Sequence, residues 1–335
     1  MFNLLKFFIY YIFSKSIILS LIIAKIKGHR PVYTSSFGFG DNVVFNIFAK
    51  NKITKNKIFC FSKTQYEVAN FFYNKEYIYR SIILLPKALN ESHIGYNFLV
   101  KSKFFKSLFL KRKAYDGKLI PISFYFQGNY QIKKFIINRL KQKKISENLK
   151  KILKKKTMTL FVKNFSLKKN NHINFQVRQT RNLEKIYTLI NYILKKKINL
   201  IILGNSKDHF IKILENNKKM TQKKNLYLFK NISKDYSIQD QAYLALKSMG
   251  WVGSGSGANA FFGLLNKKLL YIDWIIQFSD KYMKNIKYIY KKIYNKKSKI
   301  TYKMNWYDKY DSKNEIIIEN NFQEIKKNLK KHFKI

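Results

Sequence analysis

The chain has 335 residues, of which 46% are hydrophobic, and 67 Lys and Arg against 18 Asp and Glu give it a formal net charge of +49. This length suits two domains of average size, and the hydrophobic content excludes a disordered chain. Cys60 is the only cysteine and the five histidines form no ligand-spaced pair, so we expect no intramolecular disulfide and no structural metal.

The positive charge is spread along the whole chain. Lysine-rich runs occur at 151–156, 195–197 and 326–331, whereas arginine occurs only six times. A protein that binds RNA or DNA typically concentrates arginine and interleaves it with stacking aromatic residues. The charge alone therefore leaves three kinds of partner open: nucleic acid, anionic lipid and phosphorylated substrates.

The first 27 residues contain the most apolar stretch, Phe2 to Ala24, which Lys6 and Lys15 interrupt. A bilayer span needs about 20 apolar residues, and a lysine near its middle costs roughly 2.5–3.5 kcal/mol. We predict an N-terminal apolar helix within residues 1–27. Three interpretations stay open: a helix that lies in a membrane interface, a signal anchor that spans it, or a helix packed on the protein itself.

Strand and helix patterns alternate over residues 31–150. Strands are expected at 31–37, 58–61 and 81–85, and helices at 42–49 and 64–73. Such alternation is typical of a parallel sheet with helices on its faces. The lysine-rich run at 151–156 is the expected junction with the rest of the chain.

The same alternation continues over residues 155–320. Strands are expected at 174–177, 198–203, 226–229, 251–252 and 268–272, with helices at 183–194, 208–215, 237–249 and 258–265. Residues 321–335 contain a closing helix at 323–333. We therefore predict an α/β fold with two Rossmann-like domains, residues 31–150 and 155–320, that face each other across a cleft.

A glycine-serine loop links the strand at 251–252 to the helix that begins near Ala258. Unpaired backbone N–H groups at such a helix start, together with the helix dipole, favour a bound diphosphate. The candidate diphosphate-binding residues are Ser254, Gly255, Ser256 and Gly257. The alternatives are a flexible turn or a close crossing of helix and strand. No Gly-Lys-Ser or Gly-Lys-Thr follows, and the spacing differs from the dinucleotide fingerprint, which argues against ATPases and dehydrogenases.

Two of the six arginines, Arg178 and Arg181, fall within four residues directly after the expected strand at 174–177. A guanidinium binds phosphate oxygens bidentately, so both are candidate diphosphate ligands; a structural ion pair is the alternative. In a parallel sheet the carboxyl ends of the strands meet at one edge, where ligands bind. We therefore expect Arg178 and the glycine-serine loop at the same edge.

Weaker candidates follow other expected strands. Gly204, Asn205 and Ser206 come directly after the strand at 198–203 and are candidates for contact with a base or ribose, with a strand-ending turn as the alternative. Glu315 and Glu319 flank a short apolar strand. Either can hold a pair of ribose hydroxyls, but a solvated edge strand is the expected reason for them.

A second glycine turn, Gly38-Phe39-Gly40-Asp41-Asn42, opens the expected first domain. Gly38, Gly40 and Asn42 are expected to form a loop on the acceptor side. Asp41 can act as a general base that removes a proton from a substrate hydroxyl. The alternative is that Asp41 caps the helix that follows.

The order of these motifs over residues 172–320 is similar to a family of glycosyltransferases from bacterial surface-polysaccharide gene clusters. The resemblance rests on an ordered series of short motifs: VR at 177–178 with RN at 181–182, a helix with Tyr187, an apolar strand that ends at Gly204, the block 235–274 (DYSIQDQAYLALKSMGWVGSGSGANAFFGLLNKKLLYIDW) and EIIIEN at 315–320. More distantly, the chain resembles heptosyltransferase-like enzymes of the GT-B fold, in which a glycine–aspartate turn opens the N-terminal domain; here only GFGD at 38–41 matches.

The resemblance implies transfer of a sugar from a nucleotide-sugar donor to a saccharide or lipid-linked acceptor. Arg178, Arg181, Asn182 and Ser254–Gly257 would bind the donor and Asp41 would be the base. Such enzymes usually need no metal or further cofactor, and the sequence contains no Asp-x-Asp pair.

The expected partners are the nucleotide sugar, the acceptor and an anionic membrane surface, with no specific nucleic acid. The expected location is cytoplasmic, peripheral on the inner face of the plasma membrane. Two alternatives stay open: a nucleotide-sugar epimerase on the same fold, and a non-catalytic basic protein that binds nucleic acid or an anionic membrane.

Overall fold

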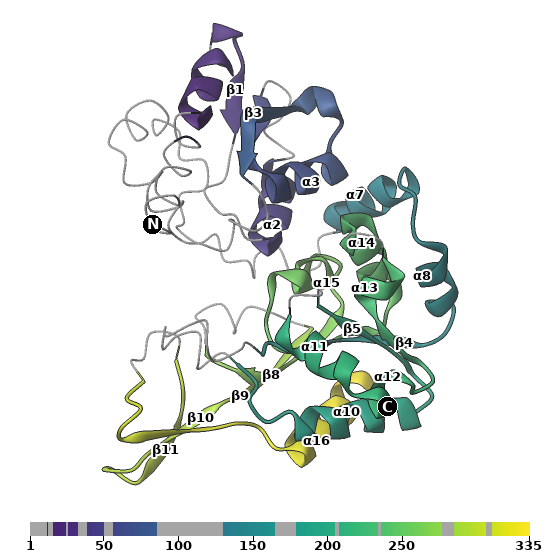
Figure 1. Cartoon of the computed structure of the whole chain (residues 1–335), viewed down its shortest axis with the longest axis vertical. Coiled ribbons are helices and arrows are strands. Elements are labelled where there is room, and N and C mark those ends of the chain that lie inside the picture. The colour runs from purple at the N-terminus through teal and green to yellow at the C-terminus, as the bar shows by residue number, and fades with distance from the viewer. Residues whose placement is uncertain are drawn as a thin grey trace. The chain divides into compact units, whose positions relative to one another are not determined.

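The computed structural model divides the chain into two compact units, Met1–Ile120 and Pro121–Ile335, each of which has an α/β architecture (Figure 1). The structure describes residues 12, 16–24, 26–32, 39–49, 56–85, 130–164, 179–204, 208–233, 236–276, 285–305 and 310–335. We expected the division near residue 150. It falls near 120 instead, because residues 130–152 form helices that belong to the second unit.

The first unit contains a three-stranded parallel sheet in the order β1-β2-β3. Its strands are β1 (Arg30–Val32), β2 (Asn56–Ser62) and β3 (Ile78–Leu85), and its helices are α2 (Phe39–Ala49), α3 (Lys63–Phe72) and the 3₁₀ turn η2 (Lys75–Tyr77). Ser62 begins α3 with a capping box, because its hydroxyl accepts the N–H of Gln65 and the Gln65 side chain accepts the N–H of Ser62.

Part of the N-terminal apolar stretch packs on this sheet. Residues 16–24 are helical, and Ile17 and Leu21 are buried on one face. On the same face, the hydroxyl of Ser20 accepts the N–H of Ile82 at 2.9 Å, and the hydroxyl of Ser16 accepts that of Ile83 at 3.2 Å. For these residues the structure therefore agrees with a helix packed on the protein itself. None of the described helices is long and apolar enough to cross a membrane.

The second unit is built on a six-stranded sheet in which every pairing is parallel, with the order β6-β5-β4-β7-β8-β9. The strands are β4 (Thr157–Phe161), β5 (Asn199–Leu203), β6 (Leu226–Leu228), β7 (Gly250–Gly253), β8 (Lys268–Trp274) and β9 (Ile286–Tyr290). In sequence order this is 3-2-1-4-5-6, the arrangement of a doubly wound nucleotide-binding sheet. The direction of winding reverses between β4 and β7.

The first strand of this sheet was not predicted. We expected a strand at 174–177 to begin the domain, but that segment lies outside the described residues. The first strand of the sheet that the structure shows is β4, directly after the run taken as the junction. Its five residues, TMTLF, follow directly on the lysine-rich run. The strand is buried on both faces, which its short apolar pattern alone does not reveal.

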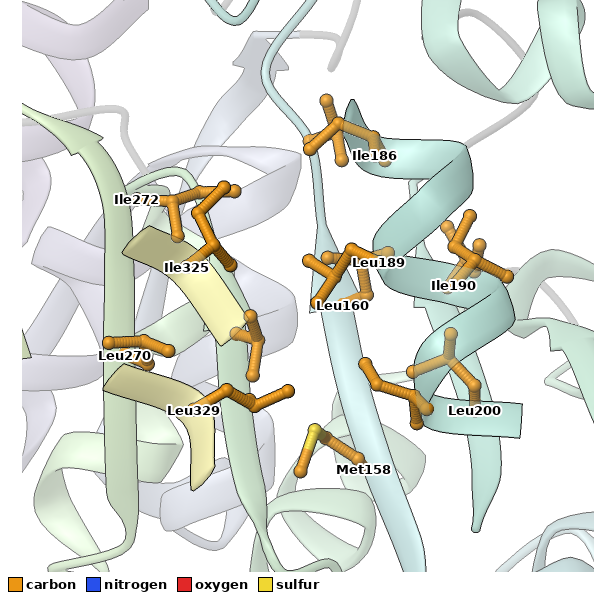
Figure 2. Packing of buried hydrophobic residues seen from close by; sticks show 14 of the residues in the cluster. Met158, Leu160, Ile186, Leu189, Ile190, Leu200, Leu270, Ile272, Ile325 and Leu329 are labelled. Carbon is orange, nitrogen blue, oxygen red and sulfur yellow. The ribbon is translucent and has the colours of Figure 1, made fainter. Parts of the chain in front are cut away.

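Helices cover both faces of the sheet. They are α7 (Tyr130–Lys141), α8 (Glu147–Ile152), α10 (Glu184–Lys195), α11 (His209–Asn216), α12 (Lys218–Thr221), α13 (Phe229–Ile232), α14 (Ile238–Lys247), α15 (Ala260–Leu264) and α16 (Phe322–Phe333). Figure 2 shows the main core, in which Leu270 and Ile272 of β8 face Ile325 and Leu329 of α16, beside Leu189 of α10. The closing helix is therefore part of this core.

A small antiparallel sheet extends the second unit. Its order is β11-β10-β12, formed by β10 (Lys292–Asn295), β11 (Ile300–Lys303) and β12 (Glu315–Ile318). Ile275, Ile293 and Met304 form its buried cluster. The sequence indicated only the last of these strands.

Candidate functional site

The glycine-serine loop lies at the carboxyl end of β7, beside the point where the sheet reverses its winding. Gly253 has φ +131°, and a Cβ at this position would overlap the carbonyl oxygen of Phe161 at the end of β4. The N–H of Ser254 donates to that same oxygen at 2.9 Å. In doubly wound sheets the crevice at this position is where ligands bind. The loop therefore occupies the place expected for a nucleotide site.

The serine hydroxyls of the loop are used within the protein. The Ser254 side chain is buried, and its oxygen accepts the N–H of Lys163 at 3.1 Å and lies 3.3 Å from the hydroxyl of Thr180. The Ser256 hydroxyl accepts the N–H of Ala258 and caps the 3₁₀ turn η6 (Gly257–Asn259) before α15. The Ser254 hydroxyl therefore links β7 to the residues after β4 and to Thr180, and it does not face solvent.

The backbone of the loop is more open than its hydroxyls. The N–H groups of Gly255, Ser256 and Gly257 make no hydrogen bond to any described residue, and these three residues are partly or fully exposed. Successive N–H groups that point to one side form a concavity that binds anions. The loop can thus offer up to three backbone donors to a phosphate at the carboxyl edge of the sheet.

Gly255 also has a packing reason to be glycine. A Cβ at this position would overlap the indole ring of Trp274, the last residue of β8. Both Gly253 and Gly255 are thus packed closely against residues of neighbouring strands rather than at a crossing of helix and strand, and this packing is compatible with an anion site. A larger residue at 255 would therefore change both the packing and the loop.

A buried network of charges lies at the same edge. The ammonium of Lys185, at the start of α10, donates to both carboxylate oxygens of Asp273, at 2.9 and 2.8 Å, and to Glu319 at 3.0 Å. The side chains of Lys185 and Asp273 are 3% and 1% exposed. Lys291 joins the network 3.6 Å from Glu319 and donates to the carbonyl of Gln179. Two buried cations are thus balanced by two carboxylates.

The network shifts the ionisation of its members in a consistent way. Burial by itself would raise the pKa of Glu319, but Lys291, Lys185 and the N–H groups of Arg181 and Asn182 together hold it below its usual value. Burial lowers the pKa of Lys291, an effect that Asp273 and Glu319 oppose. The carboxylate of Glu319 is therefore held charged.

The network fixes the segment 179–182 at the carboxyl edge. Glu319 accepts the N–H groups of Arg181 at 2.7 Å and Asn182 at 3.0 Å, and Asp273 accepts the hydroxyl of Thr180 at 2.9 Å. Thr180 in turn contacts Ser254, so the segment that contains Arg181 meets the glycine-serine loop. The side chains of Arg181 and Asn182 are exposed. The predicted juxtaposition of Arg178 with the loop stays a prediction, because Arg178 lies outside the described residues.

Our expectation for the two glutamates of the NEIIIEN segment was wrong. Neither sits on a solvated edge: Glu315 is buried and accepts the hydroxyl of Tyr302 at 2.6 Å and the N–H of Asp311 at 2.7 Å. Glu319 belongs to the network described above. Because both oxygens of each carboxylate already have protein partners, neither is arranged to hold a ribose.

Further hydrogen bonds connect the ends of β4 and β5 to their surroundings at this edge. Asn164, just after β4, donates to the carbonyl of Thr180 at 2.8 Å, and its side-chain oxygen lies 2.6 Å from Nδ1 of His209. Gly204 is buried and its N–H donates to the hydroxyl of Tyr236 at 3.0 Å; burial raises the pKa of this tyrosine. Asn205 and Ser206 lie outside the described residues, so their contact with a base or ribose stays a prediction.

In the first unit, the predicted glycine turn is mostly helix. Helix α2 begins at Phe39, so Gly40, Asp41 and Asn42 lie in its first turn rather than on a loop before it. Asn42 is buried, and Gly38 lies outside the described residues. The role of Asp41 as a base stays a prediction. Within the described part of the chain, no group of three His, Cys, Asp or Glu residues is placed to hold a metal ion.

Comparison with known proteins gives one structural likeness. No protein-family model matches the chain, and no curated protein matches it. Among solved structures, the chain is similar to ADP-heptose LPS heptosyltransferase II of E. coli, with a TM-score of 0.44 and 11% sequence identity. The likeness covers 78% of this chain and 90% of that chain.

Sequence reasoning missed most of the buried network. Lys185 lies four residues before Leu189, and therefore on the apolar side of the helix, where a charged residue needs a partner. Asp273 is the residue before the last in β8 and directly follows the four apolar residues 269–272. A charged residue within an apolar pattern indicates a buried ion pair, but the pattern does not identify the partner residue.

Proposed function

We propose that the protein is a glycosyltransferase that moves a sugar from a nucleotide-sugar donor to a saccharide or lipid-linked acceptor in cell-surface polysaccharide synthesis. The main support is one observation: the N–H groups of Gly255, Ser256 and Gly257, which make no hydrogen bond within the described part of the chain, lie beside the reversal point of a 3-2-1-4-5-6 sheet. Sheets with this order bind nucleotides at that point, and backbone donors there suit a diphosphate.

Arg181 and the loop have complementary parts in this proposal. The backbone donors of the loop bind the diphosphate in the ground state, and the guanidinium of Arg181 stabilises the negative charge that grows on the diphosphate as it leaves the sugar. Arg178 and Asn182 extend the same site, toward the second phosphate and the ribose. The buried network supports this chemistry by fixing the backbone of Arg181 and Asn182 through Glu319.

We expect Arg181→Ala to weaken the binding of a nucleoside diphosphate by about 10- to 100-fold, because a charge-assisted hydrogen bond contributes about 1.5–3 kcal/mol. The fold should persist, since the side chain is exposed and the bond to Glu319 uses the backbone. Isothermal titration calorimetry with UDP, GDP, ADP and CDP measures the effect.

Lys195→Ala is the matched control for this variant. It removes one exposed positive charge at the opposite end of α10 and should leave binding unchanged. If the wild-type protein binds none of the four diphosphates, the proposal fails. If both variants weaken binding equally and in a salt-dependent way, the diphosphate is bound by the general positive charge and not by a specific site. That result is expected for a non-catalytic basic protein.

We further propose that the protein is peripheral on an anionic membrane, at the cytoplasmic side; the exposed face of the N-terminal helical segment supports the contact with a membrane surface. Opposite the buried face of this segment, Leu19, Ile22 and Ile26 are 50%, 37% and 79% exposed. An apolar face combined with a net charge of +49 suits the interface of an anionic bilayer.

We expect Ile26→Asp to reduce co-sedimentation with vesicles of phosphatidylserine and phosphatidylcholine by about tenfold or more, because burying an isoleucine side chain contributes about 1.5–3 kcal/mol. Ile300→Asp is the control, since Ile300 is 58% exposed on β11 in the second unit. Equal binding of both variants, or wild-type binding that does not depend on the anionic lipid, would contradict this location.

A further inference from the structure

Four aromatic side chains of β8 and β9 form a continuous row. Tyr271 stacks on Trp274 with ring centroids 4.5 Å apart and on Tyr288 at 5.4 Å, and Tyr288 stacks on Tyr290 at 5.9 Å. We call these four residues the aromatic row. The residues that alternate with them, including Leu270 and Ile289, point into the core on the α16 side. The row therefore lies on the opposite face of the sheet from α16.

The row begins under the glycine-serine loop. The backbone of Gly255 lies so close to the Trp274 ring that a Cβ would overlap it, and the side-chain amide of Asn259, in η6, donates to the hydroxyl of Tyr271. Trp274 is paired with Tyr290 in the register of β8 and β9, so these two residues lie side by side at the carboxyl ends of their strands. The row thus starts at the proposed diphosphate site and continues along the same edge of the sheet.

The spacing suits a nucleotide. Strand β9 is two strands away from β7, roughly 10 Å at the usual distance between neighbouring strands. A nucleoside diphosphate covers such a reach from its phosphates to its base. Trp274, Tyr288 and Tyr290 are half-buried rather than fully packed, and the ammonium of Lys303 lies over the Tyr290 ring, 5.1 Å from its centroid. The outer end of the row is therefore partly exposed and carries a positive charge.

We propose that the carboxyl end of the aromatic row, formed by Trp274 and Tyr290, stacks the base of the nucleotide whose diphosphate binds the glycine-serine loop. Every base has a flat π face, and stacking on aromatic side chains tolerates different bases. A base that lies on Tyr290 displaces the Lys303 ammonium from the ring face and leaves it beside the polar edge of the base. This assignment rests on the proposed function.

The test separates the base from the phosphates. Wild-type protein, Tyr290→Leu and Tyr290→Phe are titrated with inorganic pyrophosphate and with the nucleoside diphosphate that binds best. We expect Tyr290→Leu to weaken nucleoside diphosphate binding by about tenfold and to leave pyrophosphate binding unchanged, because only the stacking partner is lost. Tyr290→Phe, which keeps the ring, should bind within about threefold of wild type.

A second measurement is independent of the Tyr290 variants. The nucleotide should quench tryptophan fluorescence in the wild-type protein, and this quenching should be lost in Trp274→Phe while pyrophosphate still binds. If Tyr290→Leu binds the nucleoside diphosphate as wild type does, or if quenching persists without Trp274, the stacking assignment is overturned and the diphosphate site stands. If pyrophosphate and nucleoside diphosphates both fail to bind the wild-type protein, the proposed function and this assignment fall together.

Discussion

Asp273→Ala is expected to destabilise the second unit by about 3–5 kcal/mol, the cost of leaving a buried charge without its partner. Asp273 is the main partner of Lys185, and both side chains are at most 3% exposed. Without Asp273, two buried lysines share the single carboxylate of Glu319. The variant also removes the acceptor for the hydroxyl of Thr180. Urea unfolding followed by circular dichroism measures the change.

Two comparisons distinguish this cause from a general loss of packing. Replacing both partners by apolar residues, Lys185→Met with Asp273→Leu, should recover most of the lost stability, because no unpaired charge remains. Glu147→Ala, which removes the exposed partner of Lys150 on α8, should leave the unfolding midpoint unchanged. If Asp273→Ala has the same urea midpoint as the wild-type protein, the buried charge network does not contribute to the stability of the second unit.

Gly253→Ala is expected to cost about 3 kcal/mol or more, because the position combines two separate constraints. Its φ of +131° is a conformation that residues with a side chain rarely adopt, which costs about 1–3 kcal/mol. The added Cβ would also overlap the carbonyl oxygen of Phe161, so β7 would have to move away from β4. We expect a large drop in the thermal midpoint and loss of nucleoside diphosphate binding.

Gly28→Ala separates these two constraints. Gly28 has φ +70°, but a Cβ there would meet nothing within 4 Å, so only the conformational cost of about 1 kcal/mol remains. Thermal unfolding of both variants by calorimetry provides the comparison. Equal destabilisation by the two substitutions would show that the contact between β7 and β4 contributes nothing beyond backbone conformation.

The elements that sequence predicted well are those whose burial pattern is local. The helix expected at 183–194 is α10, because apolar residues recur on one side of it. The strands expected at 198–203 and 268–272 are β5 and β8, because apolar residues dominate both segments. The strand β4 was missed because its five residues follow a lysine-rich run. The order of strands depends on pairings between distant segments, which no local pattern contains.

The candidate site was predicted only in part, because some of its features are local in the sequence and others join distant residues. The glycine-serine loop was found because glycine and serine before a helix have a local meaning, and the structure places it at the reversal point of the sheet. The network was missed because its members are far apart: Lys185 and Asp273 are separated by 88 residues. Asp273 also has φ +52°, and the strand register shifts between Tyr271 and Trp274, a local distortion that apolar patterning does not predict.

The contact between the serines of residues 16–24 and β3 has a consequence for solubility. In the described sheet β3 is an outermost strand, and Ile82 and Ile83 on it are 62% and 41% exposed. An uncovered strand of this kind is a template on which further chains add as strands. By accepting the N–H groups of Ile82 and Ile83, the hydroxyls of Ser20 and Ser16 block that template. Trimming the apolar N-terminus to improve expression would therefore favour aggregation through β3.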